Sequence, residues 1–319
     1  MKIVILDGYT ADLKELRWDF LPQGSEVKYY DLTDACDTAE RVRDAEMVLT
    51  NKVVMSEEVM AQSPRLKYIG VVATGYNVVD VKAASKLGIT VTNIPAYSTM
   101  SVAQMAMAHL LNITNAVALH AQSVRDGEWE SCPHFCYLKQ PVTELDGLVF
   151  GIVGLGNTGT ATARMAQSMG MKVMAVSGKP EETLVSMGIA KAKDCDELFA
   201  ACDVLSLHCP LTPETHHLVN ARRLALMKKN AIVINTGRGP LVDEQALADA
   251  LNEGRIMAAG VDVLEEEAPR HGSPLIHARH CHITPHIAWA SVAAKKRLLR
   301  TVADNIEAFL AGRPVNVVS

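Results

Sequence analysis

The sequence predicts an α/β protein with two domains, each built around a parallel sheet. At 319 residues, the chain is about twice the usual length of a single domain. Aliphatic residues dominate the 49% hydrophobic fraction, since only 5% of the residues are aromatic. This composition is typical of buried strands rich in Val and Ile, covered by helices rich in Ala, Leu and Met.

Five short apolar runs in the N-terminal third have the length of strands, and helical stretches separate several of them. The runs are Lys2–Leu6, Glu26–Tyr30, Met47–Thr50, Tyr68–Val72 and Thr90–Asn93. Strands that alternate with helices form parallel sheets with helices on both faces. We therefore expect a first doubly wound sheet in this part of the chain.

The next stretch, Thr99–Arg125, lacks Gly and Pro and is rich in Ala, Met and Leu. It predicts one helix about 40 Å long, at a rise of about 1.5 Å per residue. A helix of this length suits a connection between two domains or a contact between subunits. Its apolar segment, Met100–Leu119, is the candidate contact surface.

A polar connector that contains Pro, Gly127–Gly147, follows this helix. A second series of strands and helices then begins at Leu148 and continues to about Pro285. This alternation predicts a second parallel sheet, covered by helices in the same way.

The chain ends with a helical stretch, Ser291–Leu310, and with a short strand or tail, Val315–Val318. We expect this last helix to return to the first domain. One domain then comprises residues 1–98 and 287–319, and the other comprises residues 99–286.

Charge, hydropathy and cysteine content bear on the partners and the location of the protein. The formal net charge is -5 and no basic tract is present, so we expect neither a nucleic acid nor a membrane as a partner. No apolar stretch reaches the ~20 residues of a transmembrane helix, and Asp7 ends the only apolar run at the N-terminus. The seven cysteines are scattered and odd in number, which favours reduced thiols and a cytoplasmic location.

A glycine motif follows the apolar run Leu148–Val153 and opens the helical stretch Thr158–Met169. In this motif Gly154 permits a tight turn, Gly156 lets the backbone approach a pyrophosphate, and Gly159 lets the helix pack against the strand. The helix N-terminus offers free N–H groups to phosphates. The order of strand, glycine turn, helix and strand predicts a dinucleotide site.

The next strand, Lys172–Val176, ends in Ser177-Gly178-Lys179. Sites for NAD usually have an acidic residue here, which accepts hydrogen bonds from the ribose 2′-hydroxyl. Ser177 can instead donate to a 2′-phosphate, and Lys179 can pair with it. We therefore predict NADP(H) as the favoured cofactor. NAD(H) is the alternative if Lys179 is only a solvated surface residue.

Three charged side chains, Arg238, Glu267 and His286, occur just after later apolar runs. The runs are Ala231–Asn235, Ile256–Val263 and His282–Thr284. Because the carboxyl ends of parallel strands line the ligand crevice of an open sheet, we expect the three to share one edge.

Together these side chains suit the reduction of a 2-keto acid. Arg238 can bind the carboxylate and stabilise charge on the carbonyl oxygen. His286 can supply a proton near neutral pH, and Glu267 can pair with its ring and hold it in position. Each has a simpler interpretation when taken alone: a surface ion pair, a solvated acid and a loop histidine.

A metal site is the other interpretation of the histidines, because His280, His282 and His286 are close in sequence. No nearby set of thiolates or carboxylates completes such a site. Hydride transfer needs no metal, so we expect none.

Five motifs, spread over most of the chain, resemble those of the D-isomer-specific 2-hydroxyacid dehydrogenase family. They are Gly154–Gly159, His208–Thr215, Asn235–Gly239, Gly260–Glu267 and Thr284–Ala288. The resemblance implies a flavodoxin-like substrate domain, split between the two termini, around a Rossmann-type cofactor domain. It also implies a homodimer that acts on a small 2-keto or 2-hydroxy acid.

The resemblance assigns the catalytic set to Arg238, Glu267 and His286. It assigns the binding of substrate to Thr74 and Gly75, together with Arg238 and His286. The expected cofactor-binding residues are Gly154, Gly156, Asn157, Thr158, Gly159, Ser177, Gly178, Lys179, Cys209, Pro210, Thr215, Thr236, Gly237, Asp262 and Ala288. In this set Asp262 corresponds to the acceptor of the nicotinamide carboxamide, and the backbone near Cys209 and Pro210 to the adenosine side.

Within the family, the runs Ala73–Asp80, Asn93–Thr99 and His286–Ala290 are similar to those of glycerate dehydrogenases. This similarity implies reduction of hydroxypyruvate to D-glycerate, and of glyoxylate to glycolate. The chain departs from the family's pattern at Ser177, where Asp is usual. It also departs at Met100, where a polar or acidic residue is frequent in glycerate dehydrogenases, and at Ala268, which separates Glu267 from Pro.

Three alternatives remain at this stage. Phosphoglycerate dehydrogenases share the motifs, but the segment Val71–Asp80 contains no basic residue that could bind a phosphorylated substrate. A dinucleotide sensor or corepressor can retain the Arg–Glu–His set and would bind the cofactor without turnover. Another Rossmann enzyme, such as a methyltransferase, does not require the charged set at the later strand ends.

Overall fold

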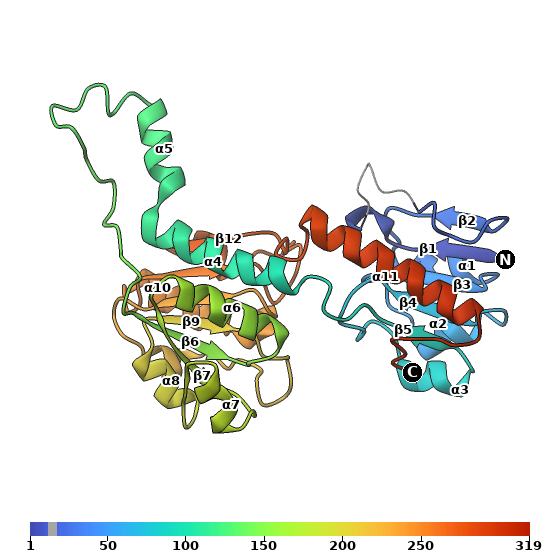
Figure 1. Ribbon diagram of the computed structural model, residues 1–319. Coiled ribbons are helices and arrows are strands. Elements are labelled where there is room, and N and C mark those ends of the chain that lie inside the picture. The colour runs from blue at the N-terminus through green and yellow to red at the C-terminus, as the bar shows by residue number, and fades with distance from the viewer. Residues whose placement is uncertain (12–17) are drawn as a thin grey trace. The chain divides into compact units, whose positions relative to one another are not determined.

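The computed structural model describes residues 1–11 and 18–319, and the chain divides into two compact units (Figure 1). Unit 1 comprises Met1–Ser98 and Ala290–Ser319, and unit 2 comprises Thr99–Trp289. Each unit contains its own parallel sheet, as the alternation of apolar runs and helical stretches predicts.

The sheet of unit 1 has five parallel strands in the order β2-β1-β3-β4-β5. The strands are β1 (Lys2–Ile5), β2 (Glu26–Tyr29), β3 (Met47–Thr50), β4 (Tyr68–Val71) and β5 (Thr90–Thr92). All five lie within the predicted apolar runs. Their order is that of flavodoxin-like folds, so the expected fold class of this unit is confirmed.

Short helices connect these strands, and polar caps mark where several of them begin. The helices are α1 (Thr38–Val42), α2 (Glu57–Ala61), α3 (Val81–Lys86) and the 3-10 turns Gly8–Thr10 and Ala35–Asp37. Ser56 accepts a hydrogen bond from Val59 N at the start of α2, and Asp80 accepts one from Ala83 N at the start of α3. Such side chains satisfy N–H groups that have no partner within the helix.

The last helix, α11 (Val292–Leu310), belongs to unit 1 and is attached through Asn305. Asn305 is buried, donates to Asn93 O at 3.0 Å, and accepts from Asn316 Nδ2 at 2.8 Å. The tail then pairs Val317 with Thr92 in an antiparallel bridge. The N-terminal and C-terminal segments therefore share one folded unit.

The sheet of unit 2 has seven parallel strands in the order β12-β11-β10-β9-β6-β7-β8. They are β6 (Val149–Val153), β7 (Lys172–Val176), β8 (Ile189–Lys191), β9 (Val204–Leu207), β10 (Ile232–Asn235), β11 (Ala258–Val261) and β12 (Cys281–Ile283). The direction of strand addition reverses between β6 and β9. In open sheets of this kind the ligand crevice lies at that point, outside the carboxyl ends of the strands.

In unit 2, α6 (Asn157–Ser168) follows the glycine motif, as the sequence predicts to within one residue at each end. The others are α4 (Thr99–Asn115), α5 (Val117–Arg125), α7 (Glu181–Ser186), α8 (Cys195–Ala201), α9 (Ala221–Leu224), α10 (Glu244–Asn252) and the 3-10 turns Gly239–Leu241 and Pro274–His277. Buried side chains of α4 and α6 pack together on the sheet; they include Ala106, Met107, Leu110, Ala163 and Ala166.

The prediction of one continuous helix over Thr99–Arg125 is wrong. Ala116 adopts the left-handed conformation, with φ of 46°, and α4 and α5 meet at an angle of 53°. Figure 1 shows α5 and the segment after it extending away from the sheet of unit 2. The break lies where the chain leaves the core, so packing decides it and local helix propensity does not.

Within the described residues, each helix taken by itself is too short or too polar to cross a membrane. In the part of the chain that the structure describes, one bent pair, α4 and α5, has the length and hydropathy of a span when the two helices are taken together.

The attachment of α11 generates a test of stability. We expect Asn305→Ala to lower the free energy of unfolding by about 1–3 kcal/mol, because buried partners of the amide lose their hydrogen bonds. Chemical denaturation of the variant measures this loss. The neighbouring residue on the helix provides the control, Asp304→Ala, for which a change within about 0.5 kcal/mol is expected. Equal stability of the two variants would contradict the proposed attachment.

Candidate active site

The glycine turn after β6 has the geometry that a dinucleotide site requires. Gly154 has φ of 92°, and a Cβ there would lie 2.6 Å from Cys209 N. A Cβ on Gly159 would collide with Gly154 O, so α6 approaches the turn as closely as glycine allows. A Cβ on Gly156 would meet no heavy atom of the described chain within 4 Å. The backbone at Gly156 is therefore open to a ligand.

The start of α6 also fits a phosphate group. Gly156 is the N-cap residue and provides no side-chain cap, so the first N–H groups of this helix have no capping side chain. Asn157 and Thr158 form the first turn. In the loop that follows β10, Thr236 Oγ1 is buried and has no hydrogen-bond partner among the described residues. An open N-terminus and an unsatisfied buried hydroxyl both fit a polar ligand such as a dinucleotide.

The three residues at the corner directly after β7, Ser177, Gly178 and Lys179, include one lysine and no acidic residue. Lys179 N donates to Ser177 Oγ at 3.2 Å, and a Cβ on Gly178 would meet no described atom within 4 Å. Lys191, at the end of β8, donates through Nζ to Lys179 O at 3.3 Å. The sequence analysis missed Lys191, because only the pairing of β7 with β8 brings it to this corner.

The loop after β9 is ordered by the hydroxyl of Thr215. Its Oγ1 donates to Pro210 O at 2.8 Å and accepts from Thr212 N at 2.7 Å. Burial lowers the pKa of His208 to about 4, and this ring lies 2.9 Å from Ser206 Oγ. Burial raises the pKa of Cys209 to about 11. Both groups are therefore uncharged at neutral pH beside the glycine turn.

Asn235, at the end of β10, holds the loop that carries Arg238. Its Nδ2 donates to Arg238 O at 2.8 Å, and its Oδ1 accepts from Gly237 N at 3.0 Å. The guanidinium of Arg238 is exposed, and Nη1 donates to Gly237 O at 2.8 Å. The backbone of this residue is thus fixed while its charged group faces outward, where it can bind an anion.

His286 and Glu267 form the pair that the sequence predicts. His286 Nδ1 lies 2.7 Å from Glu267 Oε1, and the two side chains are 27% and 38% exposed. This contact leaves Nε2 as the ring nitrogen that can exchange a proton with a ligand. Both residues line a cavity of about 570 Å³ in unit 2. Apolar side chains form much of its wall, among them Val263, Leu264, Ile276 and Ile283.

The buried carboxylate of Asp262 orders the turn that carries His286. Its two oxygens accept from Thr284 Oγ1 at 2.5 Å, Ile287 N at 3.0 Å and Ala288 N at 2.8 Å. Asp262 O also accepts from His286 N at 2.8 Å, and His286 has φ of 52°. The predicted roles of Asp262 and Ala288 toward the nicotinamide remain predictions, since in this structure the two residues bind each other.

His109 on α4 extends this network, and the sequence analysis missed it. Its Nε2 lies 3.1 Å from Thr284 Oγ1. Burial lowers the pKa of His109, while the negative charge of Asp262 acts in the opposite direction. Gly260 leaves room for this ring, because a Cβ there would lie 2.6 Å from His109 Cβ. In the sequence, the only signal for this contact was Gly260, a residue without a side chain in the strand β11.

Of the three histidines that are close in sequence, His280 and His282 lie near each other, and His286 has a different partner. His282 Nδ1 lies 3.2 Å from Asn112 Nδ2, and burial followed by the nearby His280 lowers its pKa. His286 pairs with Glu267 instead. Among the described residues, these three side chains are not grouped as potential ligands of one ion, and the expected absence of a metal remains a prediction.

The predicted substrate-binding residues of unit 1, Thr74 and Gly75, lie in the loop after β4. Thr74 Oγ1 donates to Ile94 O at 2.8 Å, and Asn93 Nδ2 donates to Thr74 O at 2.7 Å. This loop is thus ordered at the carboxyl end of a parallel strand. The role of both residues toward a substrate remains a prediction.

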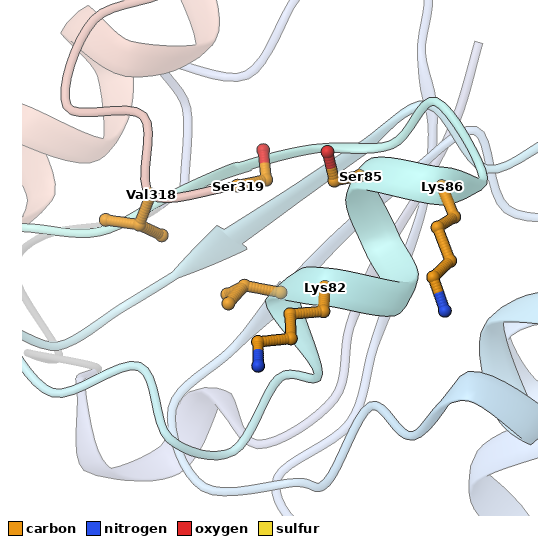
Figure 2. Close-up of a pocket in the computed structure, with 6 residues that line it drawn as sticks. Lys82, Ser85, Lys86, Val318 and Ser319 are labelled. Carbon is orange, nitrogen blue, oxygen red and sulfur yellow. The ribbon is translucent and has the colours of Figure 1, made fainter.

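A separate hollow of about 550 Å³ in unit 1 lies beside α3. Figure 2 shows Lys82 and Lys86 extending from α3, with Val318 and Ser319 on the adjacent C-terminal segment. None of the residues that line this hollow belongs to the predicted site. Of the predicted catalytic residues, His286 and Glu267 line the cavity of unit 2, and Arg238 is not among its lining residues.

Known proteins resemble this chain over its whole length. The chain matches the family model described as D-isomer specific 2-hydroxyacid dehydrogenase, NAD binding domain, over residues 107–288. It is 46% identical to a hydroxypyruvate reductase of Blautia hydrogenotrophica over 322 residues, which cover 100% of both chains. It is 40% identical to a glycerate dehydrogenase of Methylorubrum extorquens, covering 99% of this chain and 98% of that one.

Two solved structures are similar over the full length of both chains. A crystal structure of a Thermus thermophilus protein has a TM-score of 0.88 and 34% sequence identity. An acyclic imino acid reductase in complex with NADPH and D-Arg has a TM-score of 0.85 and 28% identity.

The glycine turn generates a test that separates folding from ligand binding. We expect Gly156→Ala to unfold at the wild-type temperature but to bind reduced nicotinamide dinucleotide at least about tenfold more weakly, because the added methyl occupies open space in the ligand's path. Gly154→Ala should instead unfold at a lower temperature, because of its φ and the Cys209 backbone. Thermal unfolding and cofactor fluorescence measure both effects. Unchanged cofactor affinity in Gly156→Ala would refute this assignment.

Proposed function

The chain belongs to the D-isomer specific 2-hydroxyacid dehydrogenase family, and we propose that it reduces hydroxypyruvate to D-glycerate, and glyoxylate to glycolate. As a member of this family it is an oxidoreductase that uses a nicotinamide dinucleotide. The observation that carries the proposal is the His286–Glu267 pair, on the same sheet as the glycine turn. Full-length similarity to a hydroxypyruvate reductase and a glycerate dehydrogenase supports this choice of substrate.

The proposed reaction divides the work among three side chains. When bound, the reduced nicotinamide supplies a hydride to the carbonyl carbon of the keto acid. Arg238 binds the substrate carboxylate and stabilises negative charge on the carbonyl oxygen. His286 gives a proton from Nε2 to that oxygen, which completes the hydroxyl group. Glu267 holds the ring through Nδ1 and balances its positive charge before the transfer.

The kinetic test compares two His–Glu pairs whose glutamates are neighbours in the loop after β11. We expect His286→Ala to lower kcat with hydroxypyruvate by about 10²–10⁴-fold, since the proton donor is lost. Glu267→Gln should lower kcat by a smaller factor. His271 pairs with Glu266 on the exposed side, so His271→Ala should retain wild-type kcat.

Absorbance of the reduced cofactor follows this reaction. Turnover on hydroxypyruvate that is unchanged in His286→Ala would refute the proposed chemistry. Tight cofactor binding by the wild type, without turnover on hydroxypyruvate, glyoxylate or other 2-keto acids, would favour a sensor.

We further propose that NADP(H) is the preferred cofactor. After β7 the backbone of Lys179 contacts both Ser177 Oγ and Lys191 Nζ, and an acidic residue is missing from the sequence at the end of this strand. Two ammonium groups and a hydroxyl suit the 2′-phosphate that distinguishes NADP(H) from NAD(H). The backbone carbonyl of Lys179 already accepts from Lys191, which keeps the second ammonium at this corner.

A charge introduced at this corner tests the preference. We expect Ser177→Asp to move the ratio of kcat/KM for NADPH over NADH toward NADH by about 10–100-fold, because a carboxylate repels the 2′-phosphate and accepts from a 2′-hydroxyl. Ser186→Asp adds the same charge at the end of α7 and should leave the ratio unchanged. An unaltered ratio in Ser177→Asp would exclude this cofactor assignment.

We also propose that the protein is a homodimer, and that α5 and the segment after it form much of its interface. In the expected contact helix, Ala103, Ala106, Met107 and Leu110 are buried within unit 2 and are unavailable to a partner. Exposed apolar side chains of the predicted segment Met100–Leu119 are Met100, Val117 and Leu119, and those beyond it are Val124, Trp129, Phe135, Leu138 and Val142. Phe135 is 88% exposed. Such a concentration of exposed apolar residues is typical of a protein–protein interface.

The state of association tests this surface. We expect wild-type protein to sediment with twice the chain mass of 34.5 kDa, and Phe135→Ser with Leu138→Ser to shift it toward the monomer. Val185 on α7 is 66% exposed, and Val185→Ser is the matched control that should remain dimeric. A monomeric wild type at micromolar concentration would contradict the dimer.

A further inference from the structure

His216, His217 and Glu265 meet in unit 2, although the glutamate lies far from the two histidines in sequence. The histidines are in the loop between β9 and α9, and the glutamate is in the loop after β11. One potential ligand atom from each residue lies within 4.8 Å of the other two. None of the three belongs to the proposed chemical set.

The backbone places both imidazoles on one side of the loop. Neighbouring side chains in extended chain point to opposite sides, but His217 has φ of 48°. The two rings consequently stack, with centroids 3.9 Å apart and planes inclined by 27°. His217 N donates to Pro240 O at 2.9 Å, which anchors this turn to the segment after Arg238.

The second loop presents Glu265 to this histidine pair. Its N–H donates to Glu244 Oε1 at 2.7 Å, and Glu244 is a buried carboxylate that also accepts from Ser273 Oγ at 2.5 Å. With its backbone held in this way, Glu265 reaches His217 Nε2 at 2.5 Å through Oε1. The side chains of His217 and Glu265 are 38% and 41% exposed, so an ion and a water molecule can reach them.

We propose that His216, His217 and Glu265 form a site for one divalent transition-metal ion. Two imidazoles and one carboxylate are the protein ligands of many zinc sites that keep an open position for water. Imidazole nitrogen and carboxylate oxygen also suit Ni²⁺, Co²⁺ and Cu²⁺. In tetrahedral sites the ligand atoms are about 3.4 Å apart, given metal–ligand distances near 2.0–2.1 Å. Because each imidazole binds through a lone pair in its ring plane, coordination requires the two stacked rings to turn so that one nitrogen of each faces the ion.

The surrounding charges favour a cation at this place. Glu265, Glu266 and Glu267 are consecutive acids, and the latter two contact His271 and His286 respectively. The carboxylate of Glu265 is the one directed at the stacked histidines. The ion replaces the hydrogen bond between Glu265 and His217 with two coordinate bonds. It thereby cross-links the loop that carries Glu267 to the loop after β9.

The binding test uses full-length protein from which any affinity tag has been removed, without substrate, so that it is independent of the proposed function. Calorimetric titration with Zn²⁺ should show one ion per chain, and Co²⁺ should give a visible spectrum of nitrogen and oxygen ligation. His216→Ala, His217→Asn and Glu265→Gln should each weaken binding at least about tenfold. Asparagine is chosen at position 217 because it tolerates the left-handed conformation.

Two controls separate this site from other ligands. His271→Ala removes an exposed histidine from the same loop, and the double variant Cys132→Ser, Cys136→Ser removes the close cysteine pair; both should bind Zn²⁺ as the wild type does. Zn²⁺ should raise the unfolding temperature of the wild type but not that of Glu265→Gln. Wild-type affinity in the three site variants, or a thiolate charge-transfer band with Co²⁺, would overturn the proposal.

Discussion

The buried carboxylate of Asp262 is the constraint on which the chemical edge of unit 2 depends. An ionised group inside a protein is tolerated only when its oxygens are satisfied, and here two N–H groups and one hydroxyl satisfy them. Those donors all belong to the segment from Thr284 to Ala288, so the segment must fold tightly around the end of β11. His286 takes a left-handed conformation within this turn and pairs with Glu267. The position of the proposed proton donor thus follows from the burial of a neighbouring charge.

A second constraint acts at the glycine turn, where space is more important than charge. Gly154 lies against the backbone of the loop after β9, and Gly159 lies against Gly154 itself. No larger residue fits at either position, whereas Gly156 opens outward. Because all seven strands are parallel, their carboxyl ends lie along one edge of the sheet. The glycine turn, Arg238 and the His286–Glu267 pair are therefore all delivered to that edge by strand direction.

The helical segment of unit 2 shows how packing divides an apparently uniform sequence. Thr99–Arg125 reads as one helix because it lacks Gly and Pro and is largely apolar. In the structure the first part is buried on α6 and on β10 and β11, while the second part turns away at Ala116 and exposes its apolar side chains. Both parts have the same kind of residues. Only the limit of the core, which is a property of the whole unit, distinguishes a buried helix from an exposed one.

The sequence by itself determined ten of the twelve described strands, the glycine turn and the residues of the proposed chemical set, because each is encoded by neighbouring residues: apolar runs, the steric demand for glycine, and charged groups at strand ends. It did not identify β8 and β9 individually. Tertiary structure alone decided which side chains meet. Only in the folded chain does His109 contact Thr284 and Asp262 accept a hydrogen bond from Ala288 N. The same is true of the contact between Lys191 and Lys179, and of that between Glu265 and His217. The physical reason is that these contacts join segments separated along the chain, so their distances depend on strand order and packing, which no local pattern contains.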